Sequence, residues 1–161
     1  MGYFILIFRD VMSLVPTSVS VISCIENSLI HGCTISSLVS INVQDKNPEL
    51  IFVLKKKSLI GGIIEAKNFF TISVLSCQQG DIAQKYSTNR LPEKISDTNW
   101  VVKDNFAEIS NCTITMNCKL LKIYDNHAAN IFVCTVVKHS GDQSKPSLVY
   151  DARRYGRFQP N

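Results

Sequence analysis

The sequence predicts a mostly β fold, an antiparallel barrel with a few short helices. About six segments show the strict alternation or the short apolar run that is typical of strands. Only two or three short stretches show helical spacing, and they do not alternate with the strands as the βαβ units of a parallel sheet would. The chain has 161 residues and no internal repeat, so we expect a single domain over residues 1–161.

The N-terminal part predicts one short helix and two strands. Residues 8–14 have helical spacing, and Pro16 would end that helix. Alternation over residues 18–25 predicts a strand, and the polar residues 26–28 predict the turn to a second strand. This second strand reaches Gly32, where we expect a sharp turn or a close approach of the backbone to a flat ligand.

The middle of the chain combines an apolar strand with two helical segments. Residues 50–54 are all apolar, which predicts a strand buried on both faces. Ser58 is the expected N-cap of a helix over residues 59–67. Residues 69–75 have β-type composition, and residues 79–87 predict one or two helical turns.

The last part of the chain predicts two long strands after an irregular segment. Residues 88–105 form the longest stretch without periodicity. Residues 112–123 alternate, and one face of the expected strand carries Cys112, Ile114, Met116, Cys118 and Leu120. Residues 131–137 predict another strand, apolar on both faces, and residues 140–142 predict a turn.

Composition and charge exclude several classes of protein. The chain is 45% hydrophobic and 19% charged, which excludes a disordered chain. The formal net charge of +4 suits an anionic ligand such as a nucleotide. Apart from the lysines at 55–57, the basic residues are scattered, so we expect no nucleic-acid partner.

The cysteines and the N-terminal sequence indicate the compartment. The six cysteines form no Cys-x-x-Cys pair and have no histidine at metal-ligand spacing, so we expect free thiols and no metal site. The opening MGYFILIF lacks the basic region and cleavage site of a signal peptide, and no apolar run is long enough for a membrane span. We therefore expect a cytoplasmic protein without membrane association.

The segment from His31 to Ser58 brings hydroxyl and ammonium groups together. Thr34, Ser36 and Ser37 precede the apolar strand, and Lys55, Lys56 and Lys57 follow it at the start of the expected helix. Hydroxyl donors, positive charge and a helix N-terminus together make a phosphate site. The alternative is a serine-rich turn and a solvated run of lysines.

The order of these residues resembles a known family. The pattern Gly-x-Thr-x-Ser-Ser at 32–37 is followed by Ser40-Ile41, Pro48, the apolar strand and Ser58. Later landmarks are residues 69–75, Gln78, Asp81-Ile82-Ala83, Tyr86, His127, residues 148–150, Arg153, Arg154 and Tyr155. This colinear set, from Phe8 to Phe158, is similar to the flavin reductase-like domain family. The resemblance implies an FMN-binding split β-barrel of Greek-key-like antiparallel strands.

The resemblance also implies an activity. Members transfer hydride from NADH or NADPH to FMN or FAD, and they supply reduced flavin to a partner flavin-dependent monooxygenase; the family's arrangement is a homodimer. Hydride transfer requires alignment of two rings and little acid–base chemistry, so the lack of a catalytic triad does not oppose it. Two alternatives share the barrel: an FMN-binding protein without catalysis or for electron transfer, and an oxidase of the pyridoxamine-phosphate kind. The oxidase typically needs more basic phosphate ligands than this chain shows.

By resemblance, the flavin contacts fall on two short segments. They are Cys33, Thr34, Ser36 and Ser37, and then Val53, Leu54, Lys55, Lys57 and Ser58. His127 would be the catalytic residue on the nicotinamide side, although Asp125-Asn126-His127 stands where the family often has Gly-Asp-His. Tyr150 and Arg154 would flank the nicotinamide nucleotide. The alternatives are a surface-loop histidine and a solvated C-terminal tail.

Overall fold

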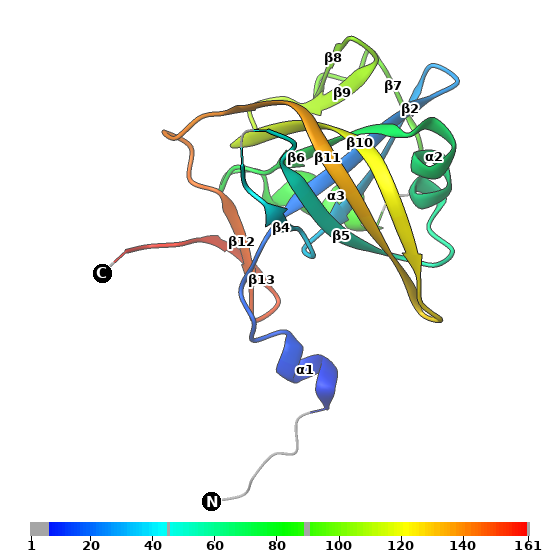
Figure 1. Ribbon diagram of the computed structural model, residues 1–161. Helices are drawn as coiled ribbons and strands as arrows, with labels where there is room; N and C mark the ends of the chain where they lie inside the picture. Colours follow the sequence, from blue (N-terminus) through cyan, green and yellow to red (C-terminus); the bar gives the residue numbers. More distant parts are fainter. Residues whose placement is uncertain (1–6, 45, 89–90, 161) are drawn as a thin grey trace, which may run out of the picture.

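The computed structural model describes residues 7–44, 46–88 and 91–160, and most of its strands form one curled antiparallel sheet. The strands of this sheet are β2 (Ser20–Glu26), β3 (Leu29–Ile35), β4 (Val39–Asn42), β5 (Glu49–Lys55), β6 (Phe69–Val74), β7 (Glu93–Lys94), β10 (Ile114–Asp125) and β11 (Ala129–Gly141). Their order is β4-β5-β11-β10-β6-β2-β3-β7, and the sheet wraps around a common interior (Figure 1). The predicted mostly β, antiparallel class is confirmed.

The remaining elements lie around this barrel. A three-stranded sheet contains β1 (Thr17–Ser18), β12 (Leu148–Asp151) and β13 (Arg154–Arg157), and β8 (Trp100–Lys103) pairs with β9 (Phe106–Ile109). The helices are α1 (Phe8–Met12), α2 (Leu59–Lys67) and α3 (Gly80–Thr88). In Figure 1, α1 lies outside the barrel, next to the β12–β13 hairpin. None of the helices in the described part of the chain has the length and apolar character that a membrane span requires.

Aromatic rings fill the centre of the barrel. Phe52 of β5 stacks on Phe132 of β11 with ring centroids 5.0 Å apart, and Phe70 of β6 meets Phe52 edge-on at 5.5 Å. Because side chains alternate along a strand, Leu50 and Leu54 point to the same interior as Phe52 and are also buried. This core holds β5, β11 and β6 in a fixed arrangement.

The opposite face of β5 is uncovered, which differs from the sequence prediction. Ile51 is only half-buried, and Val53 is 39% exposed. Val137 on β11 is 51% exposed, and Val39 and Ile41 on the edge strand β4 are also exposed. The prediction that residues 50–54 are buried on both faces is therefore wrong for a single chain, because the barrel interior covers only one face of each strand.

A second core lies outside the barrel, between β2, β3 and the segments that cover them. Val21 and Ile30 pack there with Tyr86 of α3 and Trp100 of β8. Gly32 lies within β3, where a Cβ atom would stand 2.9 Å from Tyr86 Cδ1, and it has no positive φ. The expected turn at Gly32 is therefore wrong. The glycine instead permits the close approach of α3 to the sheet.

The segment over residues 88–105 is more ordered than the sequence predicts. It contains β7 and β8, and residues 89–90 lie outside the described part of the chain. Glu93 accepts hydrogen bonds from the Tyr86 hydroxyl (2.6 Å) and from Trp100 Nε1 (2.8 Å), and its other oxygen lies 2.6 Å from Lys85 Nζ. Burial tends to raise the pKa of Glu93, but these three donors lower it overall. The Glu93 carboxylate thus connects the segment over residues 88–105 to α3.

Two smaller predictions differ in detail. Met116, Cys118 and Leu120 of β10 face the barrel core as predicted, whereas Cys112 precedes β10 and packs with the second core. The turn expected at residues 140–142 lies at residues 143–144, because pairing with Ile114 and Thr115 extends β11 to Gly141.

Replacing Gly32 with alanine should destabilise the protein, because the new methyl group would collide with Tyr86. We expect a loss of about 1–3 kcal/mol in the free energy of unfolding, measured by urea denaturation. Gly62 of α2 is the matched control, since a Cβ atom there meets nothing within 4 Å. Gly62→Ala should stabilise the helix by up to about 1 kcal/mol. Equal effects of the two substitutions would contradict this packing.

Candidate functional site

The residues at the end of β5 form a corner beside the turn between β10 and β11. Lys55, the last residue of β5, pairs with Ala129, the first residue of β11. Lys56 Nζ lies 2.7 Å from Asp125 Oδ1 at the end of β10. The structure therefore places the turn that carries His127 directly next to Lys55.

Ser37, which follows β3, is hydrogen-bonded to the backbone of β5. Its Oγ accepts a hydrogen bond from the Val53 N–H (3.0 Å) and donates one to the Val53 carbonyl (3.2 Å). The neighbouring Ser36 is exposed, and its hydroxyl makes no hydrogen bond to a described residue. Of the two predicted serines, Ser37 thus fixes the backbone, and Ser36 leaves its hydroxyl open to a ligand.

The N-terminus of α2 completes the corner. Ser58 is the N-cap residue of α2, as predicted, and its N–H donates to the Lys55 carbonyl (2.9 Å), but its hydroxyl forms no capping bond. The first turn of α2 carries no acidic residue. Lys55 and Lys57 are exposed and make no ion pair with a described residue. Open helix N–H groups and two available ammonium groups can bind an anion such as a phosphate.

Three other predicted flavin contacts have side chains that pack against the rest of the protein rather than facing solvent. Thr34 Oγ1 donates to the Ala83 carbonyl of α3 at 2.7 Å. Cys33 is half-buried against the barrel core, and Leu54 lies within that core. In this arrangement, these residues would offer a ligand mainly their backbone groups.

The residues predicted for the nicotinamide lie in two places. His127 is exposed on a turn that the Asn126 N–H closes by donating to the Ala129 carbonyl (3.0 Å). Tyr150 packs beside Tyr155 with ring centroids 5.3 Å apart, and Arg154 is exposed on the same β12–β13 hairpin. Figure 1 shows this hairpin well apart from the tip of the β10–β11 hairpin. One chain does not bring His127 together with Tyr150 and Arg154.

Sequence reasoning did not single out Asn130, which lies close to this corner. Asn130 pairs with Leu54, and its Oδ1 atom is buried with no hydrogen-bond partner among the described residues. The sequence does contain a hint of this position. Asn130 is a polar residue two positions before Phe132 on β11, and residues two apart on a strand share a face, so its side chain is expected to point into the barrel. Its amide oxygen is a free acceptor beside the candidate site.

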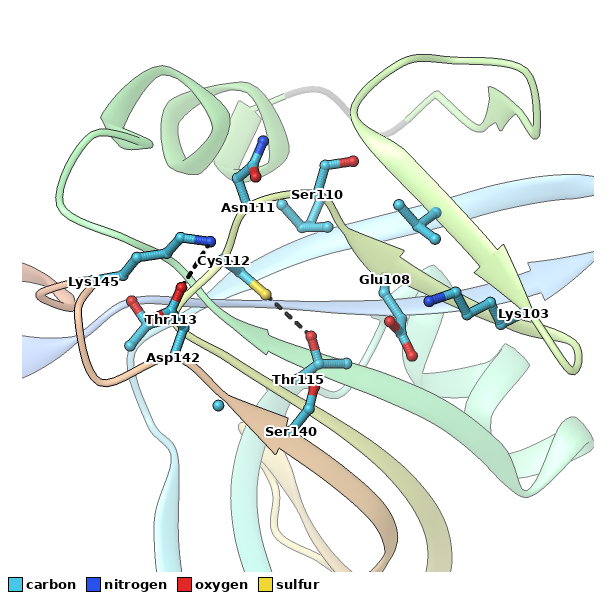
Figure 2. A pocket seen from close by; sticks show the side chains of 13 residues that line it. Lys103, Glu108, Ser110, Asn111, Cys112, Thr113, Thr115, Ser140, Asp142 and Lys145 are labelled. Atoms are coloured by element: carbon cyan, nitrogen blue, oxygen red, sulfur yellow. Dashed lines mark hydrogen bonds and ion pairs between the residues drawn. The ribbon is translucent and has the colours of Figure 1, made fainter.

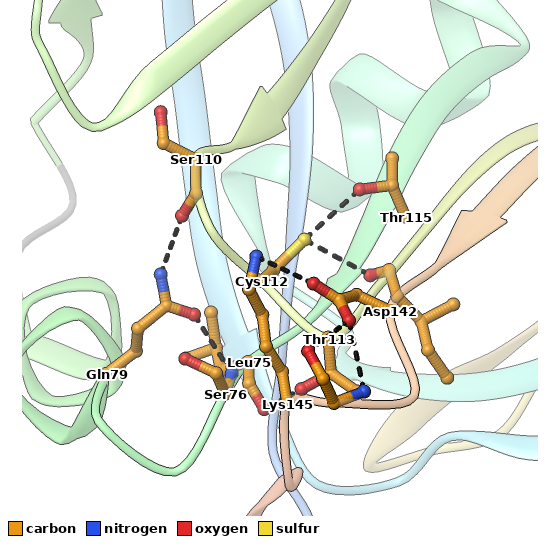
Figure 3. Close-up of polar contacts among 11 residues, drawn as sticks. Leu75, Ser76, Gln79, Ser110, Cys112, Thr113, Thr115, Asp142 and Lys145 are labelled. Atoms are coloured by element: carbon orange, nitrogen blue, oxygen red, sulfur yellow. Dashed lines mark hydrogen bonds and ion pairs between the residues drawn. The ribbon is translucent and has the colours of Figure 1, made fainter.

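A separate small pocket of about 250 Å³ lies near Cys112 (Figure 2). Figure 3 shows that some of its polar groups already bind one another, since Lys145 approaches Asp142 at 3.2 Å and Cys112 Sγ lies 3.1 Å from Thr115 Oγ1. None of the predicted flavin or nicotinamide residues lines this pocket. Among residues 7–44, 46–88 and 91–160, no group of three or more histidine, cysteine or acidic side chains is arranged to hold a metal ion.

Comparison with known proteins identifies the family. The model of the flavin reductase like domain matches residues 12–159. The chain belongs to this family. A relative of this flavin reductase-like protein is the reductase component of a 4-nitrophenol 4-monooxygenase/4-nitrocatechol 2-monooxygenase from Rhodococcus opacus. The two are 24% identical over 153 residues, which cover 95% of this chain and 80% of the relative.

Solved structures of flavin reductases have the same fold. An NADH:FAD oxidoreductase from Streptomyces globisporus, in complex with NAD and FAD fragments, matches with a TM-score of 0.84 and 21% identity, covering 95% of this chain and 92% of that one. The flavin reductase of a styrene monooxygenase from Pseudomonas putida S12 matches with a TM-score of 0.84 and 20% identity, covering 96% and 99%. The predicted split barrel is confirmed.

Replacing Lys57 with glutamine should weaken the binding of FMN but not of riboflavin, which lacks the phosphate. We expect the dissociation constant for FMN to rise roughly fivefold, because one cation of the anion site is lost. Fluorescence titration with each flavin measures the effect.

The control for this substitution is Lys56→Gln. Lys56 is already paired with Asp125, so its replacement should change FMN binding much less. An equal loss of affinity for riboflavin and FMN in the Lys57 variant would show that the corner does not hold the phosphate.

Proposed function

We propose that this protein is an NAD(P)H:flavin oxidoreductase that reduces FMN or FAD and supplies the reduced flavin to a partner flavin-dependent monooxygenase. The family match over residues 12–159 carries this proposal. The corner at the end of β5 supports it, because the open hydroxyl of Ser36 and the cations Lys55 and Lys57 suit a flavin and its phosphate.

In this proposal, the residues of the corner bind and orient the flavin. Ser37 holds the backbone around Val53, so the N–H groups there keep a fixed direction. The flavin supplies the hydride acceptor, and NADH or NADPH supplies the hydride. Hydrogen-bond donors near the flavin ring stabilise the negative charge of its reduced form. His127, exposed on the adjacent turn, would position the nicotinamide.

We further propose that the protein acts as a homodimer in the cytoplasm and that residues 1–161 of each chain form a single domain. The uncovered apolar face of β4, β5 and β11 supports dimerisation, since contiguous exposed apolar surface usually marks an interface. A second copy would also provide a Tyr150–Arg154 hairpin for the site that carries His127. The cysteines are present as thiols rather than disulfides, which is consistent with a reducing compartment.

Anaerobic stopped-flow mixing of the flavin-loaded protein with NADH and with NADPH tests the activity. We expect the visible absorption of the flavin to bleach at a rate that saturates with the nucleotide concentration. His127→Ala should slow reduction or raise the nucleotide concentration at half-saturation by about ten- to a hundredfold, because one positioning contact is lost.

Flavin titration of the same His127 variant is the control, and flavin affinity should change much less than the reduction rate. If neither nucleotide bleaches the flavin although it binds, the protein is an FMN-binding split barrel without this catalysis. If His127→Ala reduces flavin like the natural protein, or loses only flavin affinity, the histidine has no role on the nicotinamide side.

A further inference from the structure

We propose that the outer face of β10 binds an acidic surface of the protein that receives the reduced flavin. This β10 face is formed by Lys119, Leu121, Lys122 and Tyr124, together with Phe69 of the neighbouring β6. The partner contact rests on the function proposed above and adds to it the place and the charge of the docking surface. It is carried by a strand bulge, by two cation–π contacts and by the register of the sheet.

The bulge in β10 places Lys119 and Lys122 on the same side of the sheet. Residues three apart on a regular strand point to opposite faces. The pairing of β10 with β11 shifts register between these two residues, so Lys119 pairs with Thr135 and Lys122 pairs with Val133. Thr135 and Val133 are two apart on β11 and share the face opposite to the buried Cys134. Both lysines therefore project from the outside of the barrel, where they are exposed.

Each lysine lies over an exposed aromatic ring. Lys119 Nζ is 6.0 Å from the ring centroid of Phe69, and Lys122 Nζ is 4.6 Å from the ring centroid of Tyr124. Leu121, the extra residue of the bulge, is exposed beside them. A cation–π contact holds an ammonium group in place without neutralising its charge. The β10 face therefore combines apolar area with two ordered positive charges.

These two charges have no counter-ion in the described part of the chain. Neither lysine forms an ion pair with a described residue, and the residues paired with them across the sheet are uncharged. In the same rows of the sheet, the one acidic residue is Glu49, which β11 separates from Lys119. Asp125, at the end of β10, is already paired with Lys56. The remaining positive charge attracts an acidic surface and raises the rate of encounter with it.

The register of the sheet connects this face to the flavin corner. Val53 of β5 pairs with Ile131 of β11, and Ile131 pairs with Tyr124, so the three residues lie side by side across the sheet. Neighbouring strands are about 4.8 Å apart, which places the Cα atoms of Val53 and Tyr124 roughly 10 Å from each other. A protein bound to the β10 face would therefore stand beside the site that the reduced flavin leaves.

Charge distinguishes the β10 face from the face proposed for the homodimer. The exposed residues Val39, Ile41 and Val53 of β4 and β5 are apolar, as in a lasting interface, whose centre contains few lysines. A face with two uncompensated lysines suits a partner that binds, takes up the flavin and dissociates. Charge raises the association rate of such a partner without requiring a large apolar contact.

A titration of the isotope-labelled protein with a 15-residue poly-L-glutamate peptide, followed by nuclear magnetic resonance with saturating FMN present, tests this surface. We expect the largest amide shifts at residues 119–124 and a weaker affinity as the salt concentration rises. The double variant Lys119→Gln/Lys122→Gln should bind the peptide with a roughly tenfold higher Kd. Lys145→Gln is the matched control, since Lys145 Nζ already lies 3.2 Å from Asp142; it should leave the Kd unchanged.

Anaerobic reduction of the flavin by NADH and NADPH separates this proposal from the proposed activity. The double variant should reduce flavin at the rate of the natural protein, because neither lysine belongs to the flavin corner. If the peptide binds to residues 119–124 but neither nucleotide reduces the flavin, the proposed activity fails and the docking surface stands.

Three results of the titration would overturn the docking surface. They are largest shifts at residues 55–57, an unchanged Kd in the double variant, and tighter binding of a 15-nucleotide oligo(dT) than of the peptide. Light scattering provides a fourth criterion. A double variant that forms less dimer than the natural protein would assign the β10 face to a second copy of the chain and not to an acidic partner.

Discussion

The pairing of β5 with β11 fixes the position of the whole candidate site. Phe52 and Phe132 stack almost parallel, at 6° between ring planes, and Gly61 lets α2 approach Phe132 so closely that a Cβ atom would stand 3.3 Å from its Cζ. A slip of one residue would turn these rings out of the barrel. The register therefore sets where Lys55 and Ser58 leave the sheet and where the His127 turn meets them.

The same pairing gives the sheet one buried face and one exposed face. The side chains on one face of β5 fill the barrel, whereas Val53 on the other face and the apolar residues of the neighbouring β4 are exposed to solvent. The Val53 carbonyl of β5 also accepts a hydrogen bond from the Ser37 hydroxyl. A single strand therefore contributes to the core, the exposed apolar face and the candidate flavin corner. The β12–β13 hairpin lies outside this unit: β12 pairs with β1, and Arg153 forms an ion pair with Asp10 of α1, so the arginines of the hairpin belong to a different part of the surface.

Much of the fold could be predicted from the sequence, because the strands and helices have clear periodicity. The mostly antiparallel barrel and the position of the Lys55–Ser58 corner follow from local patterns. The role of Gly32 could not be read in this way, because the crowding comes from Tyr86, which is distant in sequence. The inward direction of Thr34 depends on α3, and the separation of His127 from Arg154 depends on how the hairpins pack. Local patterns also cannot show which arginine an aspartate such as Asp10 will neutralise.

The most direct test of the account is a nuclear magnetic resonance titration of the isotope-labelled protein with FMN, because it reports where the flavin binds residue by residue. We predict that the largest amide shifts occur at Ser36, Ser37 and residues 53–58, with a further change at His127, and that residues 110–115 stay unperturbed. Largest shifts around Cys112, or along residues 150–157 alone, would contradict the assignment of the flavin site to the end of β5.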